Sequence, residues 1–285
     1  MLRRMTHLIA ILALTAVLAH AQRAANLPTE FDMYCTGVVT SQAVPHDTYV
    51  ISGVESDQYI VYSQGQFVFI NKGARQGVKV GDEFLVSRPE SDPVGVPWIT
   101  WQVSLSRAMG TTYADLGRLR VTSVQANTAV ALIVKACDYI QRGDIVQAFT
   151  PRPAPQYKPK AALDLFAAPS GKAKAMIVYG LHFGSVAGAG NIVYVNLGAK
   201  QGVQVGTYFR IFTYQDARHD VVYAAPRTEY MEFGFGSTPK PYTWADLPRD
   251  ILGEGIVVRV GPNASTVLIT ASKRDIYAGD YVEVE

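Results

Sequence analysis

Histidine and cysteine are scarce in this sequence of 285 residues, which contains five histidines and two cysteines. It has no His-x-x-x-His pair and no Gly-x-Ser-x-Gly motif, and so few potential ligands do not make a zinc site. Acidic residues stand singly at predicted turns, as at Asp82, Asp144 and Asp280, where aspartate stabilises the turn. Asp115 and Asp246 sit in matching Ala-Asp-Leu stretches, which we interpret as caps. The sequence therefore predicts no catalytic residue, metal or cofactor, and a protein that is not an enzyme.

Charge is also sparse, since charged residues make up 18% of the chain and hydrophobic residues 48%. This composition is typical of a globular protein. The net charge of +2 includes Arg3 and Arg4; without those two of the 26 basic residues, 24 remain against 24 acidic ones. No stripe of lysine and arginine is present that would neutralise a row of phosphates. We expect no nucleic-acid partner.

The N-terminus has the pattern of a signal peptide over residues 1–21. Arg3 and Arg4 are followed by an apolar run from Leu8 to Leu18, and Ala19 and Ala21 place small residues where a signal peptidase reads. We predict cleavage before Gln22. The alternative is a membrane anchor, but the run is about half of a bilayer-spanning length. No later run is long enough to span a membrane, so we expect a periplasmic or extracellular protein with no stable membrane span after cleavage.

Export would place the two cysteines, Cys35 and Cys137, in an oxidising compartment. We predict a disulfide between them, which would join the N-terminal segment to the late part of the first half of the chain. Two separately buried thiols are the alternative.

An internal repeat is the strongest feature of the chain. Residues 66–88 align without a gap on residues 191–213, and residues 116–149 align on residues 252–285. Short runs of Val, Ile and Phe alternate with turns, and five or six such strands hide their edges best by closing on themselves. We predict a mostly β protein with two tandem small β-barrel-like modules joined by a Pro-rich linker.

Repeated glycines mark the predicted turns of both modules. Gly73 and Gly77 are expected to adopt positive φ in the first turn, and tight turns follow at Gly-Asp pairs. A phosphate-binding loop is the alternative, but the Gly-Lys-Ser/Thr ending and the following helix are missing. The structural turn glycines are Gly73, Gly77, Gly81, Gly143, Gly198, Gly202, Gly206 and Gly279.

The domain boundaries follow from the repeat and from composition. After the signal peptide (1–21) we expect an N-terminal leader (22–47) with one extra strand, a first module (48–149), a Pro/Lys-rich linker (150–172) with little structure of its own, and a second module (173–285).

The two modules differ most in an insertion in the middle of each. Residues 89–115 carry Trp98, Trp101, Leu105, Ala108 and Met109, which we place on one face of a short helix. Residues 214–251 are rich in aromatics. Either these residues cap their own barrel or they form a contact surface for a protein or a glycan. The candidate contact surface is Trp98, Trp101, Tyr230, Phe233, Phe235, Tyr242 and Trp244.

The run GARQGVKVGDEFLV (73–86), followed by LGRLRVTSVQANTAVALIV (116–134) and a closing Gly-Asp, resembles the C-terminal barrel domain of flagellar assembly protein T. Its Gly-Val-x-x-Gly rhythm is also similar to the paired barrels of the rod-shape scaffold protein MreC, although the coiled coil of that family is missing. The resemblance implies a non-enzymatic periplasmic protein that assembles with other envelope proteins. We therefore expect a scaffold, adaptor or assembly factor, with a binder of peptidoglycan or another glycan as the alternative and an undetected envelope enzyme as the third possibility.

Overall fold

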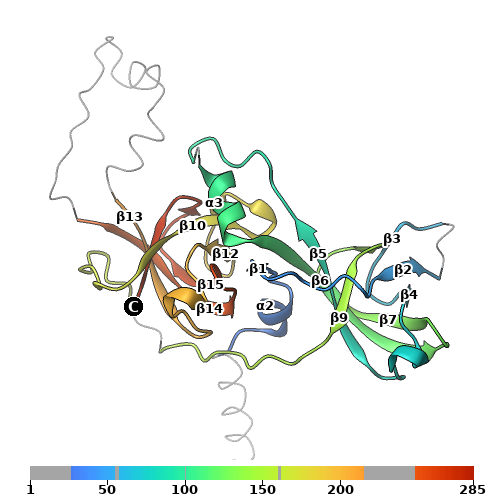
Figure 1. Cartoon of the computed structure of the whole chain (residues 1–285). Helices are drawn as coiled ribbons and strands as arrows, with labels where there is room; N and C mark the ends of the chain where they lie inside the picture. Colours follow the sequence, from blue (N-terminus) through green and yellow to red (C-terminus); the bar gives the residue numbers. More distant parts are fainter. Residues whose placement is uncertain (1–26, 55–57, 100, 160–161, 215–247) are drawn as a thin grey trace, which may run out of the picture.

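The computed structural model describes residues 27–54, 58–99, 101–159, 162–214 and 248–285 (Figure 1). The described chain consists mainly of β-strands in two groups, with a short N-terminal helix, one longer helix and three 3-10 turns. The first half contains α2 (Glu30–Tyr34), β1 (Val38–Thr40), β2 (Val50–Gly53), β3 (Val61–Tyr62), β4 (Phe67–Ile70), η1 (Ala74–Gln76), β5 (Glu83–Glu90), α3 (Gln102–Met109), β6 (Thr111–Val124), β7 (Ala129–Ala136), β8 (Ile140–Gln141) and β9 (Ile145–Ala148). The second half contains β10 (Lys174–Gly180), η2 (Leu181–Phe183), β11 (Val186–Ala187), β12 (Ile192–Val195), η3 (Ala199–Gln201), β13 (Tyr208–Thr213), β14 (Asp250–Val260), β15 (Ser265–Ser272), β16 (Ile276–Tyr277) and β17 (Tyr281–Val284).

The second group of strands forms a closed barrel in the order β10-β12-β15-β14-β13-β17, with β17 pairing back to β10. The first group has the corresponding order β2-β4-β7-β6-β5-β9, and β1 adds to β6. Its two ends are joined by an isolated bridge between Tyr49 and Ile145 and the backbone hydrogen bonds around it. The second barrel has the strand pair Met176 and Tyr281 at the same place. The prediction of a mostly β fold with a barrel is confirmed. The first module, however, is a curved sheet closed at one bridge.

The two modules also share their pairing register. Phe67 faces Leu132 and Phe69 faces Val130 in the first module, and the aligned residues Ile192, Leu268, Tyr194 and Thr266 form the same two pairs in the second. Bulges recur at aligned places as well, between Val86 and Ser87 and between Ile211 and Phe212. Bulges set the bend of a strand, so their repetition gives both modules the same curvature.

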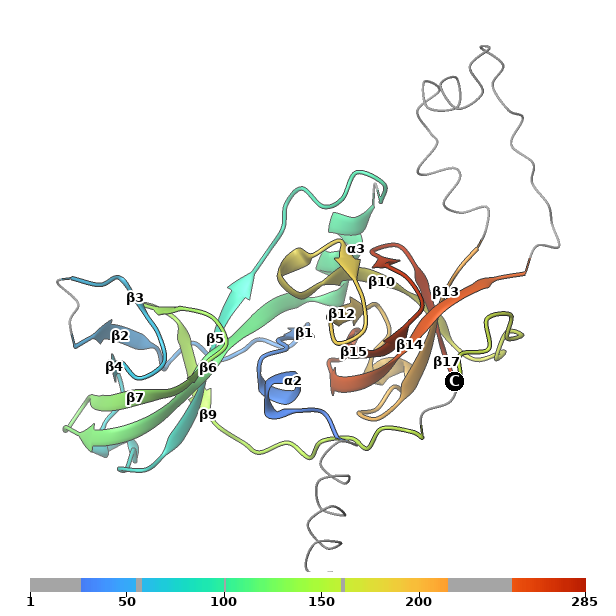
Figure 2. The same ribbon diagram turned by 180° about the vertical axis from the view of Figure 1, so that it is seen from behind.

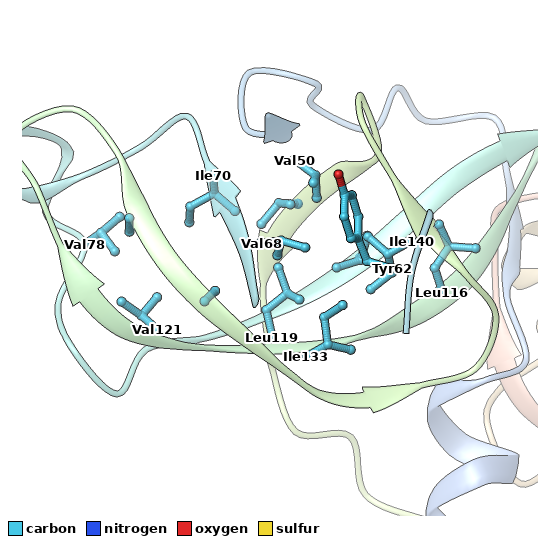
Figure 3. Close-up of a cluster of buried hydrophobic side chains, with 14 of the residues drawn as sticks. Val50, Tyr62, Val68, Ile70, Val78, Leu116, Leu119, Val121, Ile133 and Ile140 are labelled. Carbon is cyan, nitrogen blue, oxygen red and sulfur yellow. The ribbon is translucent and has the colours of Figure 1, made fainter. Parts of the chain in front are cut away.

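Each module has its own apolar core, because the strands alternate between inward and outward side chains. In β4 the side chains of Val68 and Ile70 are buried, whereas Phe67 and Phe69 point outward. Figure 3 shows the inward set of the first module, which comes from β2, β4, β6 and β7 and includes Tyr62 and Ile140 from the small β3–β8 pair. The second core is built in the same way around Phe209 and Ile211.

The two glycines of the turn after β4, Gly73 and Gly77, are needed for different reasons. Gly77 ends η1 with φ of +85°, a conformation that glycine adopts at little cost. Gly73 has φ of −139°, so the expectation of a positive φ there is wrong. A Cβ at Gly73 would lie 2.3 Å from the carbonyl oxygen of Gln125. Gly73 is therefore required by the close approach of another strand end.

This difference predicts unequal effects of substitution. Gly73→Ala is expected to lower the free energy of unfolding by about 1–3 kcal/mol, because backbone atoms must move to admit the methyl group. Gly77→Asn has open space around the new side chain, and asparagine tolerates the left-handed conformation, so a loss below about 1 kcal/mol is expected. Urea unfolding of the two variants measures this, and equal losses would contradict the assignment.

The segment between the modules contains neither helix nor strand in its described parts, 150–159 and 162–172. It is nevertheless held against the second barrel along its length. The backbone N–H of Lys158 donates to the hydroxyl of Tyr208 at 2.8 Å, and that of Ile251 donates to the carbonyl of Leu165 at 3.3 Å. The segment is therefore a strap on the barrel surface, which contacts the second module although it forms no helix or strand of its own in its described parts.

Within the described ranges, no helix has the length and apolar character that a membrane span requires.

Candidate functional site

The described part of the predicted contact surface consists of Trp98 and Trp101 in the first insertion. Trp98 and Trp101 precede α3, so the expectation that both lie on one face of that helix is wrong. The indole N–H of Trp98 donates to the carbonyl of Ala278 in the second module at 2.9 Å, so this insertion caps the other module and not its own. Tyr230, Phe233, Phe235, Tyr242 and Trp244 lie outside the described residues.

An apolar cluster joins the leader and the first insertion to the second barrel. Helix α2 and strand β1 lie between the two modules, and helix α3 lies over the second barrel beside β10; the two views agree on this placement (Figures 1 and 2). They cover the outer face of β10, β12 and β15, which gives the barrel a second apolar layer. The cluster includes Met33, Val39, Leu105 and Met109 from the first side and Val178, Tyr179, Ile192, Tyr194 and Leu268 from the second.

Buried hydrogen bonds fix how the two sides of this interface meet. The Tyr194 hydroxyl donates to the carbonyl of Thr36 at 2.8 Å, and the Tyr179 hydroxyl lies 2.8 Å from the hydroxyl of Thr112. The side-chain amide of Gln102 donates to the carbonyl of Val178. Burial raises the pKa of Tyr194 well above its ordinary value, so it is a neutral donor. Satisfied buried polar groups favour one relative orientation of the modules.

A buried ion pair crosses the same interface. Both carboxylate oxygens of Asp115, in β6, lie 2.9 Å from Nη1 of Arg259, in β14. The backbone N–H of Gly37 donates to the same carboxylate at 3.0 Å, and the Asp115 side chain is only 1% exposed. The interpretation of Asp115 as a cap is wrong, because it lies within a strand and links leader, first module and second module. Its counterpart Asp246 lies outside the described residues.

Arg152, at the start of the strap, binds the leader beside this ion pair. Its guanidinium donates to the carbonyl of Met33 and lies over the ring of Tyr34, 4.7 Å from the ring centre. Burial, and then repulsion from Arg259, lowers the pKa of Arg152 to about 10, which leaves it charged at neutral pH. The strap is thus held at its beginning as well as along the barrel.

The predicted disulfide between Cys35 and Cys137 is confirmed, with Cα atoms 5.3 Å apart. Cys35 directly follows α2 at the interface, and Cys137 directly follows β7 of the first module. The bond therefore ties the leader covalently to the first module, while the leader's apolar side chains contact the second.

The outer face of the first module, in contrast, carries apolar side chains that no described residue covers in a comparable way. These side chains come from β2, β4 and β7, which are adjacent in the sheet. Phe67 is 41% exposed and the others are partly exposed. We call this surface the open face; its residues are Ile51, Phe67, Phe69, Val130 and Leu132.

A groove of about 620 Å³ lies at one end of the first module, between the entry to β2, the η1 turn and the start of β5. Its charged side chains already have partners. Lys72 lies 2.5 Å from the carboxylate of Asp47, and the carboxylate of Asp82 accepts a hydrogen bond from the backbone N–H of Lys79. The groove therefore presents little unpaired charge to a ligand.

Among the described residues, no group of three or more His, Cys, Asp or Glu side chains is placed to hold a metal ion. The features that the described chain offers for function are thus the interface that orients the modules and the open face. The pairing of Asp115 with Arg259 gives no signal in the sequence. The open face gives one: the runs FVFI (67–70) and AVALIV (129–134) are apolar on both sides of their strands, which is typical of a strand covered on both faces.

A comparison with models of known protein families gives no match, and neither does a comparison with curated protein sequences.

A second ion cluster anchors the end of the strap on the closed barrel. The carboxylate of Glu283, 1% exposed, accepts hydrogen bonds from both terminal nitrogens of Arg249 at 2.8 and 2.9 Å and one from Arg210 at 3.1 Å. The backbone N–H of Ser170, in the strap, donates to it at 3.2 Å. Burial, the largest single influence, raises the pKa of Glu283. The hydrogen bonds from Arg249 and Ser170 and the charges of Arg249 and Arg210 together outweigh burial and hold that pKa below its ordinary value.

This lowered pKa predicts an acid-sensitive contribution to stability. A carboxyl group with a folded-state pKa below its unfolded value of about 4.5 stabilises the fold above that pH, and this contribution is lost as the pH falls through the folded-state pKa. We expect Glu283→Gln to cost about 2 kcal/mol of unfolding free energy at pH 7 and progressively less below pH ~4. Denaturant unfolding between these pH values measures the difference. Gln147 is the aligned residue of the first module, and Gln147→Asn serves as the control because it should leave the pH dependence of the unfolding free energy unchanged. If the unfolding free energies of Glu283→Gln and the wild type change with pH in parallel, the assignment to Glu283 is wrong.

Proposed function

We propose that this chain is a non-catalytic, exported cell-envelope protein that acts as a scaffold, adaptor or assembly factor through protein–protein contacts. The observation that carries the proposal is the open face on a module whose orientation is set by a buried interface. Contiguous apolar side chains on an otherwise ordinary surface are typical of interaction sites. A module held by buried hydrogen bonds and an ion pair presents that face in a defined direction.

Two further observations support the proposed location and role. The Cys35–Cys137 disulfide suits an oxidising compartment, as the N-terminal signal pattern predicts. The resemblance to flagellar assembly protein T points to the same class of envelope assembly proteins.

Photo-crosslinking in the cells that make the protein tests the proposal. A photoreactive residue at Phe67 or Leu132 is expected to form adducts with protein, and one at Val94, which is 83% exposed but outside the open face, is expected to form few. Equal labelling from all three positions, or none from the open face, would contradict the proposal. Sedimentation with purified cell wall tests the glycan alternative, which predicts co-sedimentation unaffected by substitutions in the open face.

A further inference from the structure

The open face has a counterpart in the second module, and that counterpart is covered. In the shared pairing register, the counterparts of its four β4 and β7 residues are Ile192, Tyr194, Thr266 and Leu268. These four residues are between 1% and 7% exposed, because the leader and the first insertion pack over them. The repeat thus shows that this face of a module is covered by segments of a neighbouring module.

The first insertion reaches across the second barrel between two of its turns. A Cβ at Gly279, before β17, would lie 3.2 Å from the side chain of Ile99. In the turn between β14 and β15, the side-chain amide of Asn263 donates to the carbonyl of Ala108, in α3, at 3.3 Å. At Gly143, the first module's counterpart of Gly279, a Cβ would meet no described atom within 4 Å. The corresponding place on the first module is therefore uncovered among the described residues.

The second module has an insertion at the same place in its fold. In the first module the last aligned pair before the insertion is Arg88 with Ala114, and in the second it is Thr213 with Asp250. The second insertion is therefore residues 214–249, of which 215–247 lie outside the described part of the chain. By its place in the repeat, it is the segment that would cover the same face of a further module.

The two insertions also share a short motif. Residues 97–101 read Pro-Trp-Ile-Thr-Trp, and residues 241–244 read Pro-Tyr-Thr-Trp. In the first insertion this motif contacts the second barrel, through the indole of Trp98 and the side chain of Ile99. Aromatic side chains are enriched in protein interfaces, and the second insertion is rich in them. Its sequence therefore suits an apolar sheet face.

The chemistry of the open face fits an insertion that binds without a leader. In the second barrel, the hydroxyls of Tyr194 and Thr266 donate to two backbone carbonyls of the leader. Their counterparts in the open face, Phe69 and Val130, have no hydroxyl. The strap takes the place of a leader before the second module, and it stays on its own barrel. An open face that meets only the insertion needs no donors for leader carbonyls.

The contact is expected between copies of the chain, because the second insertion begins and ends far from the open face. In both views β2, β4 and β7 lie at one end of the molecule, and β13 lies at the other (Figures 1 and 2). Within the chain, the insertion of the first module likewise covers the next module and not its own. Repeating that relation joins the second module of one copy to the first module of another, which is a head-to-tail contact.

We propose that the open face of one copy binds the second insertion, residues 215–247, of another copy, so that copies associate head to tail. The inference rests on the proposed function and deepens it by naming the chain itself as the protein partner. Because no leader takes part, the contact buries less surface than the contact between modules. Association is therefore expected to be reversible and to depend on concentration.

Sedimentation velocity of the oxidised chain without its predicted signal peptide tests the inference. The weight-average mass of the wild type is expected to rise with concentration to about twice the monomer mass or more, because a head-to-tail contact does not close at a dimer. Phe67→Asp in the open face and Tyr242→Ser/Trp244→Ser in the second insertion should each remain monomeric. Val94→Asp, a change at an exposed apolar residue outside both, should behave like the wild type.

Mixing the two variants identifies the contact. The Phe67→Asp chain keeps its second insertion and the Tyr242→Ser/Trp244→Ser chain keeps its open face, so the mixture should form a 1:1 dimer and nothing larger. A photoreactive residue at Leu132, in protein mixed with an isotope-labelled copy, should crosslink to labelled peptides from 215–247. A monomeric wild type, a monomeric mixture, or crosslinks confined to peptides outside 215–247 would overturn the inference.

A melting experiment separates this contact from capping of the second barrel by its own insertion. Tyr242→Ser/Trp244→Ser should leave the circular dichroism spectrum and the melting temperature of dilute, monomeric protein unchanged. A lower melting temperature with self-association retained would show that the insertion caps its own barrel, and would overturn the inference. Phe67→Thr replaces Phe67→Asp if the latter does not fold.

The inference and the proposed function can fail separately. If the wild type is monomeric but the open face still crosslinks to another protein in cells, the inference fails and the proposed function stands. If the chain self-associates and crosslinks to no other protein, the inference stands without a wider adaptor role.

Discussion

Asp115→Ala is expected to lower the free energy of unfolding by about 3–5 kcal/mol, because it leaves the charge of Arg259 without its partner at a buried interface. It also removes the acceptor of the Gly37 N–H, which positions the leader. Urea unfolding at pH 7 measures the loss. The effect should exceed that of any surface substitution, since exposed ion pairs contribute little.

Two variants serve as controls for this result. Asp47→Ala removes an ion pair of the same kind, with Lys72, from the surface of the first module and should change stability little. The double variant Asp115→Leu/Arg259→Met removes both charges and should recover much of the loss, since apolar replacement of a buried pair is often nearly neutral. A single variant as stable as the wild type would show that the interface does not contribute to stability.

Removing the disulfide is the second large effect. Cys35→Ser/Cys137→Ser is expected to cost about 4 kcal/mol, because the bond closes a loop of 102 residues and restricts the unfolded chain. The same loss should appear when a reductant is added to the wild type during urea unfolding. The single variants provide the control, since each already lacks the bond and should equal the double variant. An unchanged midpoint under reductant would contradict the assignment of a stabilising bond.

Much of the architecture is predictable from the residues alone. The alignment of 66–88 on 191–213 holds down to the pairing of individual residues, because turn glycines and alternating apolar positions are local signals. The disulfide was predictable because only two cysteines exist. The role of Gly73 was not, since its φ is ordinary and its constraint is the distant carbonyl of Gln125.

The candidate site was less predictable than the fold. The aromatic residues of the first insertion predict a contact region, and in the structure Trp98 contacts the second module of the same chain. Asp115 and Arg259 are far apart in sequence, and nothing local connects them. The sequence contains a signal for the open face, because its strands are apolar on both sides. The signal becomes specific only when the structure shows that the aligned residues of the second module are buried.

The central claim is that the leader, the first insertion and the strap hold the two modules in one fixed arrangement. Differential scanning calorimetry of the oxidised chain tests this most directly. The account predicts one cooperative transition whose calorimetric and van't Hoff enthalpies agree, and separation into two transitions in Asp115→Ala. Two transitions in the wild type, unchanged by Asp115→Ala, would contradict it.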